Sequence, residues 1–264
     1  MKDNWKDKIA LITGASSGIG AATARELARH GMRVVLVARR LARLEELAAE
    51  IKAEGGEAHA IAADLSQAED RERVFTQIVE TSGAPDVLVN NAGLGWYGYY
   101  ADMPWETAQE MLQVNVAAVM HLTRLFLPTM RPLERGHIVN VGSISGGMPN
   151  QGIAIYAASK AFLNAFTSSL YRELVGTRLH VSVVRAGPVS SEFYQTAKTR
   201  PGGRPVPAER FAVTSESVAH SIWGLLQRPR KVIYVPGILS ISSWLEPLFG
   251  WFIDRLGPLL LKRP

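Results

Sequence analysis

Two ionisable side chains, Tyr156 and Lys160, stand four positions apart in a Tyr-Ala-Ala-Ser-Lys segment. On a helix this spacing places both side chains on one face, so that the ammonium group lies close to the phenol. A phenol has a pKa of about 10 and is a poor proton donor at neutral pH, but a nearby positive charge favours the phenolate and lowers that pKa. Taken alone the spacing is also typical of surface residues. With Ser143 before it at the end of an apolar segment, the pair predicts a general acid or base.

A glycine-rich turn, Thr-Gly-Ala-Ser-Ser-Gly-Ile-Gly at residues 13–20, stands between an apolar segment and a helical pattern. Its glycines permit a tight turn, close approach of a pyrophosphate and packing of the helix on the strand, and the helix N-terminus then attracts the phosphates. The alternative is a turn that needs glycines for its shape alone, but the position between strand and helix favours a dinucleotide site. The residues assigned to this site are Gly14, Ser16, Ser17, Gly18, Ile19 and Gly20.

Two arginines, Arg39 and Arg40, follow the second apolar segment, where such folds place the residue that selects between NAD and NADP. A carboxylate there would accept the ribose 2′-hydroxyl, whereas guanidinium groups match the geometry of a 2′-phosphate. NADP is therefore the predicted cofactor, with a solvated helix start as the alternative. Asp64 and Leu65, after the third segment, are predicted to lie beside the adenine.

The charge balance favours an anionic small molecule over nucleic acid. The chain has 29 basic and 24 acidic residues, but no run of Lys or Arg forms a basic arm. Cysteine is absent, which excludes disulfides, cysteinyl metal sites and a thiol nucleophile, and the six histidines are too scattered to predict a metal site. The first residues lack the apolar stretch of a signal peptide, so we expect a cytoplasmic protein.

Short apolar segments alternate with segments of helical periodicity from residue 8 onward, which is typical of βαβ units. Strands are predicted at 9–13, 33–38, 58–62, 87–90, 137–141, 180–185 and 231–235. Helices are predicted at 18–30, 41–54, 67–82, 105–130, 156–175 and 215–227. The prediction is one α/β domain over residues 1–235, a doubly wound Rossmann-type fold with a seven-stranded parallel sheet and helices on both faces.

Taken together these motifs resemble those of the classical short-chain dehydrogenases/reductases, over residues 8 to about 235. The motifs shared in order and spacing are the turn at 13–20, Asp64, Asn90-Asn91-Ala92-Gly93, Asn115, Ser143 and Tyr156-x-x-x-Lys160. The resemblance implies a catalytic set of Asn115, Ser143, Tyr156 and Lys160. It also implies that the cofactor contacts Asn91, Ala92, Gly93, Tyr156, Lys160, Gly187, Val189 and Ser191.

Two departures from the family pattern affect the cofactor site. The family's Pro-Gly-x-Val-x-Thr segment is Ala186-Gly-Pro-Val-Ser-Ser191 here, so the nicotinamide contact of Ser191 is less secure than those of the turn glycines. Many NADP-dependent members carry a basic residue at the position of Ser17. The prediction of NADP therefore depends on Arg39 and, less firmly, on Arg40.

The function that the resemblance implies is NADP-dependent interconversion of a carbonyl and a secondary alcohol on a mainly apolar small molecule. In reduction, Ser143 would bind the carbonyl oxygen and Tyr156 would protonate it. Lys160 would bind the nicotinamide ribose and lower the pKa of Tyr156, and Asn115 would hold a water that links Lys160 to solvent. The alternatives are a 3-oxoacyl-thioester (acyl-carrier-protein) reductase and, less favoured, a non-catalytic NADP-binding regulator. The 29 residues after Val235 favour a branch that resembles broad-specificity reductases and hydroxysteroid dehydrogenases.

Two loops are predicted to line the substrate site, at residues 94–100 and 188–214, with 201–205 as a mobile lid or a plain solvent loop. The aromatic residues of the first loop would form an apolar pocket or pack against a neighbouring subunit of a homodimer or homotetramer.

The tail, residues 236–264, is predicted to be an amphipathic helical extension. Its apolar face comprises Leu245, Leu248, Phe249, Phe252 and Leu256. Burial in the chain's own substrate pocket or against a partner subunit is favoured over association with a membrane surface.

Overall fold

The computed structural model describes residues 5–133, 135–205 and 212–260. Within these ranges all the strands are parallel and form one sheet in the order β3-β2-β1-β4-β5-β6-β7. Their bounds are β1 (Ile9–Thr13), β2 (Arg33–Ala38), β3 (Glu57–Ala62), β4 (Val87–Asn90), β5 (Gly136–Ser143), β6 (Leu179–Ala186) and β7 (Val232–Val235). The order reverses between β1 and β4, which confirms the predicted doubly wound fold.

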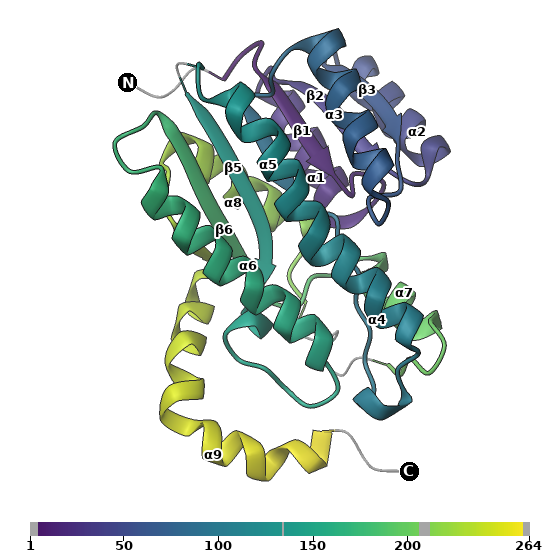
Figure 1. Cartoon of the computed structure of the whole chain (residues 1–264), viewed down its shortest axis with the longest axis vertical. Coiled ribbons are helices and arrows are strands. Elements are labelled where there is room, and N and C mark those ends of the chain that lie inside the picture. The colour runs from purple at the N-terminus through teal and green to yellow at the C-terminus, as the bar shows by residue number, and fades with distance from the viewer. Residues whose placement is uncertain (1–4, 134, 206–211, 261–264) are drawn as a thin grey trace.

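Helices cover both faces of the sheet (Figure 1). One face packs against α1 (Gly18–Arg29), α2 (Leu41–Ala53) and α8 (Ser215–Gln227). The other packs against α3 (Ala68–Ser82), α5 (Ala118–Met130) and α6 (Ala154–Glu173). Gly31 and Gly55 follow α1 and α2 with positive φ, as expected of residues that end helices.

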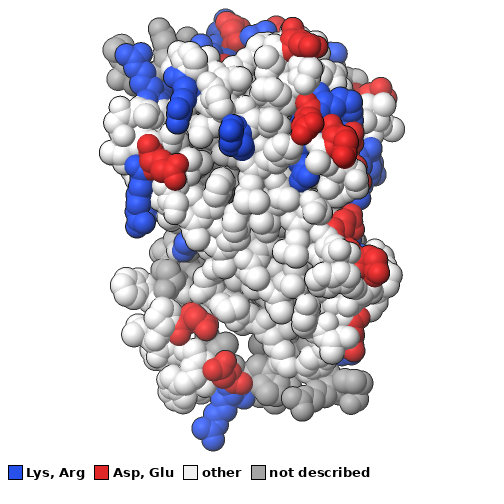
Figure 2. All heavy atoms as spheres, in the orientation of Figure 1, with Lys and Arg blue, Asp and Glu red and all other residues white. Residues whose placement is uncertain are grey.

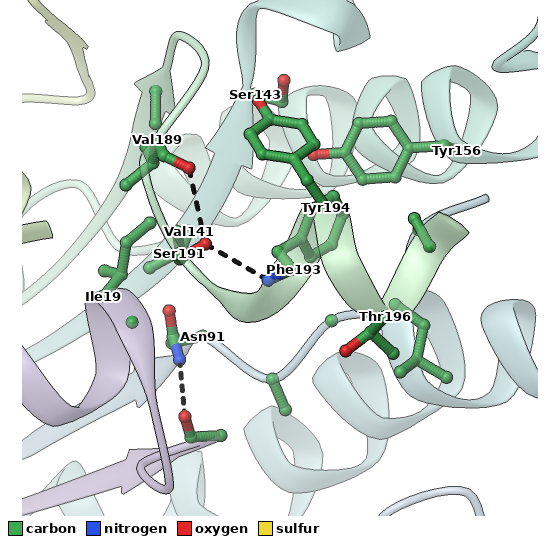
Figure 3. A pocket seen from close by; sticks show the side chains of 18 of the residues that line it. Ile19, Asn91, Val141, Ser143, Tyr156, Val189, Ser191, Phe193, Tyr194 and Thr196 are labelled. Carbon is green, nitrogen blue, oxygen red and sulfur yellow. Dashed lines mark hydrogen bonds between the residues drawn. The ribbon is translucent and has the colours of Figure 1, made fainter. Parts of the chain in front are cut away.

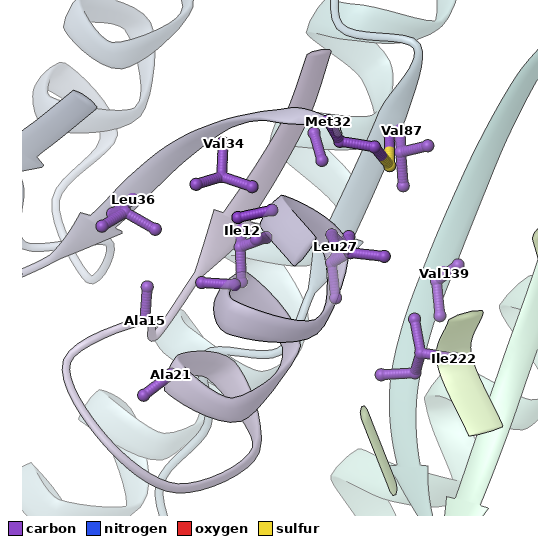
Figure 4. Packing of buried hydrophobic residues seen from close by; sticks show 14 of the residues in the cluster. Ile12, Ala15, Ala21, Leu27, Met32, Val34, Leu36, Val87, Val139 and Ile222 are labelled. Carbon is purple, nitrogen blue, oxygen red and sulfur yellow. The ribbon is translucent and has the colours of Figure 1, made fainter. Parts of the chain in front are cut away.

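The sheet has a hydrophobic layer on each face because successive side chains of a strand point to opposite sides. In β1, Ala10 and Ile12 belong to the cluster under α1 and α8, whereas Ile9 and Leu11 belong to the cluster under α3 and α5. Figure 4 shows Ile12 packed near Leu27 of α1. With both faces covered, β1 is buried along its whole length.

The predicted helix at 105–130 is three consecutive helical segments. These are α4 (Trp105–Leu112), a π-helical segment (Gln113–Ala117) and α5. Asn115, one of the predicted catalytic residues, lies in the π-helical segment. Widened turns of this kind are frequent at functional sites.

The segment 188–214 contains a helix, α7 (Glu192–Thr199), that the sequence analysis does not include. After α7, the indole of Trp96 donates to the carbonyl of Pro201, and the amide of Arg204 donates to the carbonyl of Tyr97. The two loops predicted to line the substrate site therefore contact each other. The predicted mobility of 201–205 stays a prediction, and residues 206–211 lie outside the described residues.

The predicted tail helix is present as α9 (Ser242–Leu260), which follows a 3-10 turn at Gly237–Ile241 and runs along the lower edge of the molecule (Figure 1). Trp244, Leu248 and Trp251 are exposed by 60–67%. Among the described side chains of α9, none lines the substrate pocket, and the burial of this helix on its own domain or against a partner subunit stays a prediction. The side chain of Leu256 lies outside those described. No helix among the described residues is both long and apolar enough to cross a bilayer.

Candidate active site

A cavity of about 810 Å³ opens at the carboxyl ends of the strands, where the order of the sheet reverses. All but two of the residues predicted to bind cofactor or to act in catalysis line this cavity. Those that line it are Gly14, Ser16, Ser17, Gly18, Ile19, Arg39, Arg40, Asp64, Leu65, Asn91, Ala92, Gly93, Ser143, Tyr156, Lys160, Gly187, Val189 and Ser191. Gly20 and Asn115 lie behind its wall. Among the described residues, no three His, Asp or Glu side chains gather as metal ligands.

The glycine-rich turn is shaped by close backbone contacts. A Cβ added to Gly14, whose φ is +66°, would lie 2.8 Å from the Cα of Ala92, and one on Gly20 would lie 2.3 Å from the carbonyl oxygen of Gly14. The side-chain amide of Asn91 donates to the Thr13 carbonyl at 2.9 Å and connects the loop after β4 to the turn. Only glycine fits at these two positions, which leaves the turn's amides open toward the cavity.

The two predicted 2′-phosphate ligands are paired with carboxylates at the cavity edge. Arg39 donates to Glu110 of α4 at 3.0 Å. Arg40 donates to Glu192 of α7 at 2.7 Å and to the hydroxyls of Ser16 and Ser17 at 3.0 and 2.9 Å. Arg40 therefore connects the glycine-rich turn to α7, whereas Arg39 pairs with α4.

Asp64 and Leu65, which are predicted to lie beside the adenine, line the cavity just after β3. The Asp64 carboxylate accepts from the amide of Ser66 at 3.0 Å, and the Asp64 amide donates to Asp70 at 2.6 Å. These bonds fix the loop that would border the adenine.

The predicted catalytic side chains meet at the other end of the cavity. Tyr156 and Lys160 project from the first turns of α6, and Ser143 ends β5. The Lys160 ammonium donates to the carbonyl of Val141 at 2.9 Å and lies 5.8 Å from the centre of the Tyr156 ring. Helix geometry thus brings the phenol and the ammonium together as the spacing predicts.

The pKa of Tyr156 is raised in this structure, whereas the spacing to Lys160 predicts a lowered pKa. Burial raises the pKa of Tyr156 to about 12, and this effect outweighs the hydrogen bond with Ser143, which lowers it. Burial also lowers the pKa of Lys160 to about 8. The desolvation of both groups is therefore the dominant influence.

Asn115 is fully buried and organises the wall behind Lys160. Its side-chain oxygen accepts from the amide of Leu94 at 2.8 Å, and its amide donates to the Leu94 carbonyl and to the Ser159 hydroxyl at 2.9 and 3.0 Å. A Cβ on Gly93 would lie 3.5 Å from both the Asn115 oxygen and the Lys160 ammonium nitrogen, so both groups lie beside Gly93 in the cavity wall. The water predicted to link Lys160 to solvent at Asn115 stays a prediction.

Replacing Lys160 with Met should stabilise the fold at neutral pH, because the buried ammonium is costly to desolvate. The folded pKa of about 8 lies below the ordinary lysine value of 10.5, so the unfolded chain binds more protons between these values. The free energy of unfolding of Lys160→Met is thus expected to exceed that of wild type by about 1–3 kcal/mol below pH 8. The difference should fade as pH rises to 10.5, in urea titrations at several pH values. A variant less stable than wild type at pH 7 would contradict this account.

Ser191 and the segment 188–214 are predicted from the sequence, but the helix α7 and the places of Phe193 and Tyr194 beside Tyr156 are not. Ser191 caps α7 by accepting from the amide of Phe193, and the Phe193 ring lies 5.6 Å from that of Tyr156. Figure 3 shows the Tyr194 ring beside Ser143 and the Tyr156 hydroxyl. A Ser followed directly by a Glu is a helix-start signal that could have revealed α7.

Comparison with known proteins identifies the family. The family model described as short chain dehydrogenase matches residues 8–201. An uncharacterized oxidoreductase of Staphylococcus epidermidis is 32% identical over 86% of this chain and 94% of its own length. A 3-oxoacyl-[acyl-carrier-protein] reductase of Synechocystis is 33% identical over 87% of this chain and 93% of its own length.

Solved structures agree with the sequence relatives. A short-chain dehydrogenase from Sphingobium yanoikuyae, in complex with NADPH, has a TM-score of 0.80 and 29% identity, and covers 97% of this chain and 98% of its own. A Burkholderia phymatum short chain dehydrogenase/reductase in complex with NAD has a TM-score of 0.85 and 25% identity, and covers 93% of this chain and 94% of its own. With its sheet order, glycine-rich turn and Ser143, Tyr156 and Lys160 at one end of the cavity, the chain belongs to the short-chain dehydrogenase family of oxidoreductases.

Proposed function

We propose that the protein is an NADP-dependent oxidoreductase that interconverts a carbonyl and a secondary alcohol on a mainly apolar small molecule. The observation that carries this proposal is one cavity with Arg39 and Arg40 at one end and Ser143, Tyr156 and Lys160 at the other. Guanidinium groups and a catalytic Ser-Tyr-Lys set in one cavity are what a dinucleotide with a 2′-phosphate requires.

The residues present fit such a cofactor. The backbone at Gly14 and Gly20 leaves no room for a side chain, and a pyrophosphate can approach the N-terminus of α1. The guanidinium groups of Arg39 and Arg40 would hold the 2′-phosphate. The relatives crystallised with NADPH and with NAD show that related chains hold either cofactor, and the two arginines favour the phosphorylated one.

When bound, the nicotinamide exchanges a hydride with the substrate carbon. Ser143 would donate a hydrogen bond to the carbonyl oxygen, and Tyr156 would transfer the phenolic proton to it. A pKa of about 12 keeps the phenol protonated at neutral pH, which is the form that reduction requires. Lys160 would orient the nicotinamide ribose and resupply the proton through a water held by Asn115.

The side chains around Tyr156 favour an apolar substrate. The lining of the cavity near the catalytic residues includes Leu94, Trp96, Ile144, Met148, Ile153 and Phe193. A 3-oxoacyl thioester is the second candidate, and the Synechocystis reductase supports it. A complete set of Ser143, Tyr156 and Lys160 disfavours a regulator without catalysis.

Oxidation of NADPH, followed by absorbance, tests the proposal against ketosteroids, acetoacetyl thioesters, aromatic aldehydes and quinones. Turnover of apolar ketones or aldehydes with NADPH, and much less with NADH, is the expected result. Selective turnover of acetoacetyl thioesters would support the second candidate. Binding of NADPH without turnover of any carbonyl in the panel would overturn the enzymatic proposal.

We further propose that the protein is a homo-oligomer and that α9 contributes to its interface. Apolar side chains of α9 are exposed, and its described charged residues are Glu246, Asp254 and Arg255. Two acidic residues and one basic residue do not form the basic face that anionic membranes attract. Figure 2 shows few charged side chains over the lower part of the visible face. Leu248→Glu with Phe252→Glu should therefore reduce the oligomer mass measured by light scattering.

The matched control for α9 is Val175→Glu, which adds a charge at a site 71% exposed in the turn after α6. This control should leave the mass unchanged. If wild type floats with liposomes and the double variant does not, while both have the same mass in solution, α9 binds a lipid surface instead.

A further inference from the structure

The first residues of α7 lie across the cavity from its cofactor end to its catalytic end. Ser191 faces the glycine-rich turn, since its Cβ is 3.0 Å from the position of a Cβ on Gly18. Glu192 pairs with Arg40, and Phe193 packs on Gly95 and on the ring of Tyr156. One short stretch of chain thus contacts the glycine-rich turn, Arg40 and Tyr156, and Figure 3 shows Ser191, Phe193 and Tyr194 along it.

The Glu192 carboxylate lies in a positively charged setting. One oxygen is 2.7 Å from Arg40, and the other is 3.9 Å from Arg43. The Arg40 guanidinium, a hydrogen bond from Ser17 and the charge of Arg43 all hold the pKa of Glu192 below its usual range. Arg40 also contacts Ser16, so a carboxylate, a guanidinium group and two hydroxyls form one hydrogen-bonded cluster.

The other end of α7 is tied to the neighbouring arginine. Arg200, directly after α7, donates to one oxygen of Glu110 at 2.8 Å, and Arg39 donates to the other at 3.0 Å. Arg39 and Arg40 therefore contact the carboxylates that hold the two ends of the helix. An anion that binds both guanidinium groups therefore weakens the pairing of Arg40 with Glu192 and that of Arg39 with Glu110.

We propose that Glu192 is a specificity-determining residue whose carboxylate competes with the 2′-phosphate of NADP(H) for Arg40. This inference rests on the proposed function, because it requires a 2′-phosphate at Arg39 and Arg40. The phosphate, with about two negative charges and three acceptor oxygens, displaces a single carboxylate. NAD(H) has no group that can do so.

Displacement of Glu192 has a consequence at the catalytic end. Phe193 and Tyr194 follow Glu192 in the same helical turn, and both rings lie at Tyr156. Loss of the pairing between Glu192 and Arg40 removes one attachment of the helical turn that carries these rings. Glu192 acts through Arg40 and not on the reacting atoms.

The test measures the dissociation constants of NADPH and NADH for wild type and Glu192→Gln by fluorescence titration. Loss of the competing charge should tighten NADPH binding about threefold to tenfold and change NADH binding less than twofold. Glu46→Gln is the matched control, because it removes the same charge from a partner of Arg43 that does not line the cavity. The control should leave the ratio of the two constants unchanged.

A second measurement follows α7 itself. Hydrogen exchange of residues 192–199 in wild type should rise on addition of adenosine 2′,5′-bisphosphate and not of adenosine 5′-monophosphate, because only the former carries the 2′-phosphate. Equal or weaker NADPH binding by Glu192→Gln would overturn the inference. Weaker NADH binding by this variant would show that Glu192 accepts the ribose hydroxyl instead. If wild type does not prefer NADPH over NADH at all, the proposed cofactor fails as well.

Discussion

Tyr156→Phe is expected to lower the rate of carbonyl reduction by about 10²- to 10⁴-fold and to leave the dissociation constant of NADPH nearly unchanged. The substitution removes the phenolic proton but keeps the ring that packs against Phe193 at 5.6 Å. Since burial holds the pKa of Tyr156 at about 12, the phenol carries its proton throughout the neutral range. The loss should therefore be as large at pH 6 as at pH 8.

The control for this prediction is Tyr171→Phe on the same helix. Tyr171 is 38% exposed, and its ring faces Lys231 at 5.9 Å, away from the cavity. Turnover and NADPH binding should match wild type in this variant. Turnover of Tyr156→Phe at the wild-type rate would remove Tyr156 from the mechanism, and a parallel loss of NADPH binding would give it a structural role.

The fold could be predicted because its determinants are local. Both faces of the sheet are covered, so each strand is a short run of residues such as Val and Ile. The alternation of these apolar runs with helical segments, and the turns between them, identify the strands and helices. The glycine-rich turn is equally local, because the clash of a Cβ on Gly20 with the Gly14 carbonyl depends on residues six apart in sequence. These features locate the cofactor-binding end of the site from the sequence alone.

The features that could not be predicted from the sequence depend on contacts between segments that are distant along the chain. The pairing of Arg40 with Glu192 joins residues 152 positions apart, and nothing in either neighbourhood specifies it. The pKa of Tyr156 is a second case, because the spacing to Lys160 predicts the sign of one interaction but not the burial that outweighs it. Nothing in the local sequence marks the π-helical segment at Asn115 either, because Gln113–Ala117 continues the helical pattern on both sides.

Arg40→Asp is expected to weaken NADPH binding about ten- to a hundredfold and NADH binding far less. The loss of a charge-assisted contact to a phosphate corresponds to roughly 1.5–3 kcal/mol, and the new carboxylate adds repulsion. Arg39→Asp should act in the same direction, but the structure places Arg40 in the larger network, with Ser16 and Ser17 of the turn. Fluorescence titration with both cofactors measures the effect, and equal loss for NADPH and NADH would refute the assignment.

Arg43→Asp is the control for Arg40→Asp. It makes the same change of charge at an arginine outside the cavity, and so tests whether the effect depends on the position of the charge. Arg43 is the next arginine on α2 and lies 3.9 Å from Glu192, but it does not line the cavity. We expect a small change in NADPH binding for this variant, because the charge is exposed and screened. Combining Arg40→Asp with Glu192→Gln completes a double-mutant cycle. If Glu192 acts on the 2′-phosphate only through Arg40, its substitution no longer tightens NADPH binding once Arg40 is gone, whereas an independent effect of Glu192 would persist.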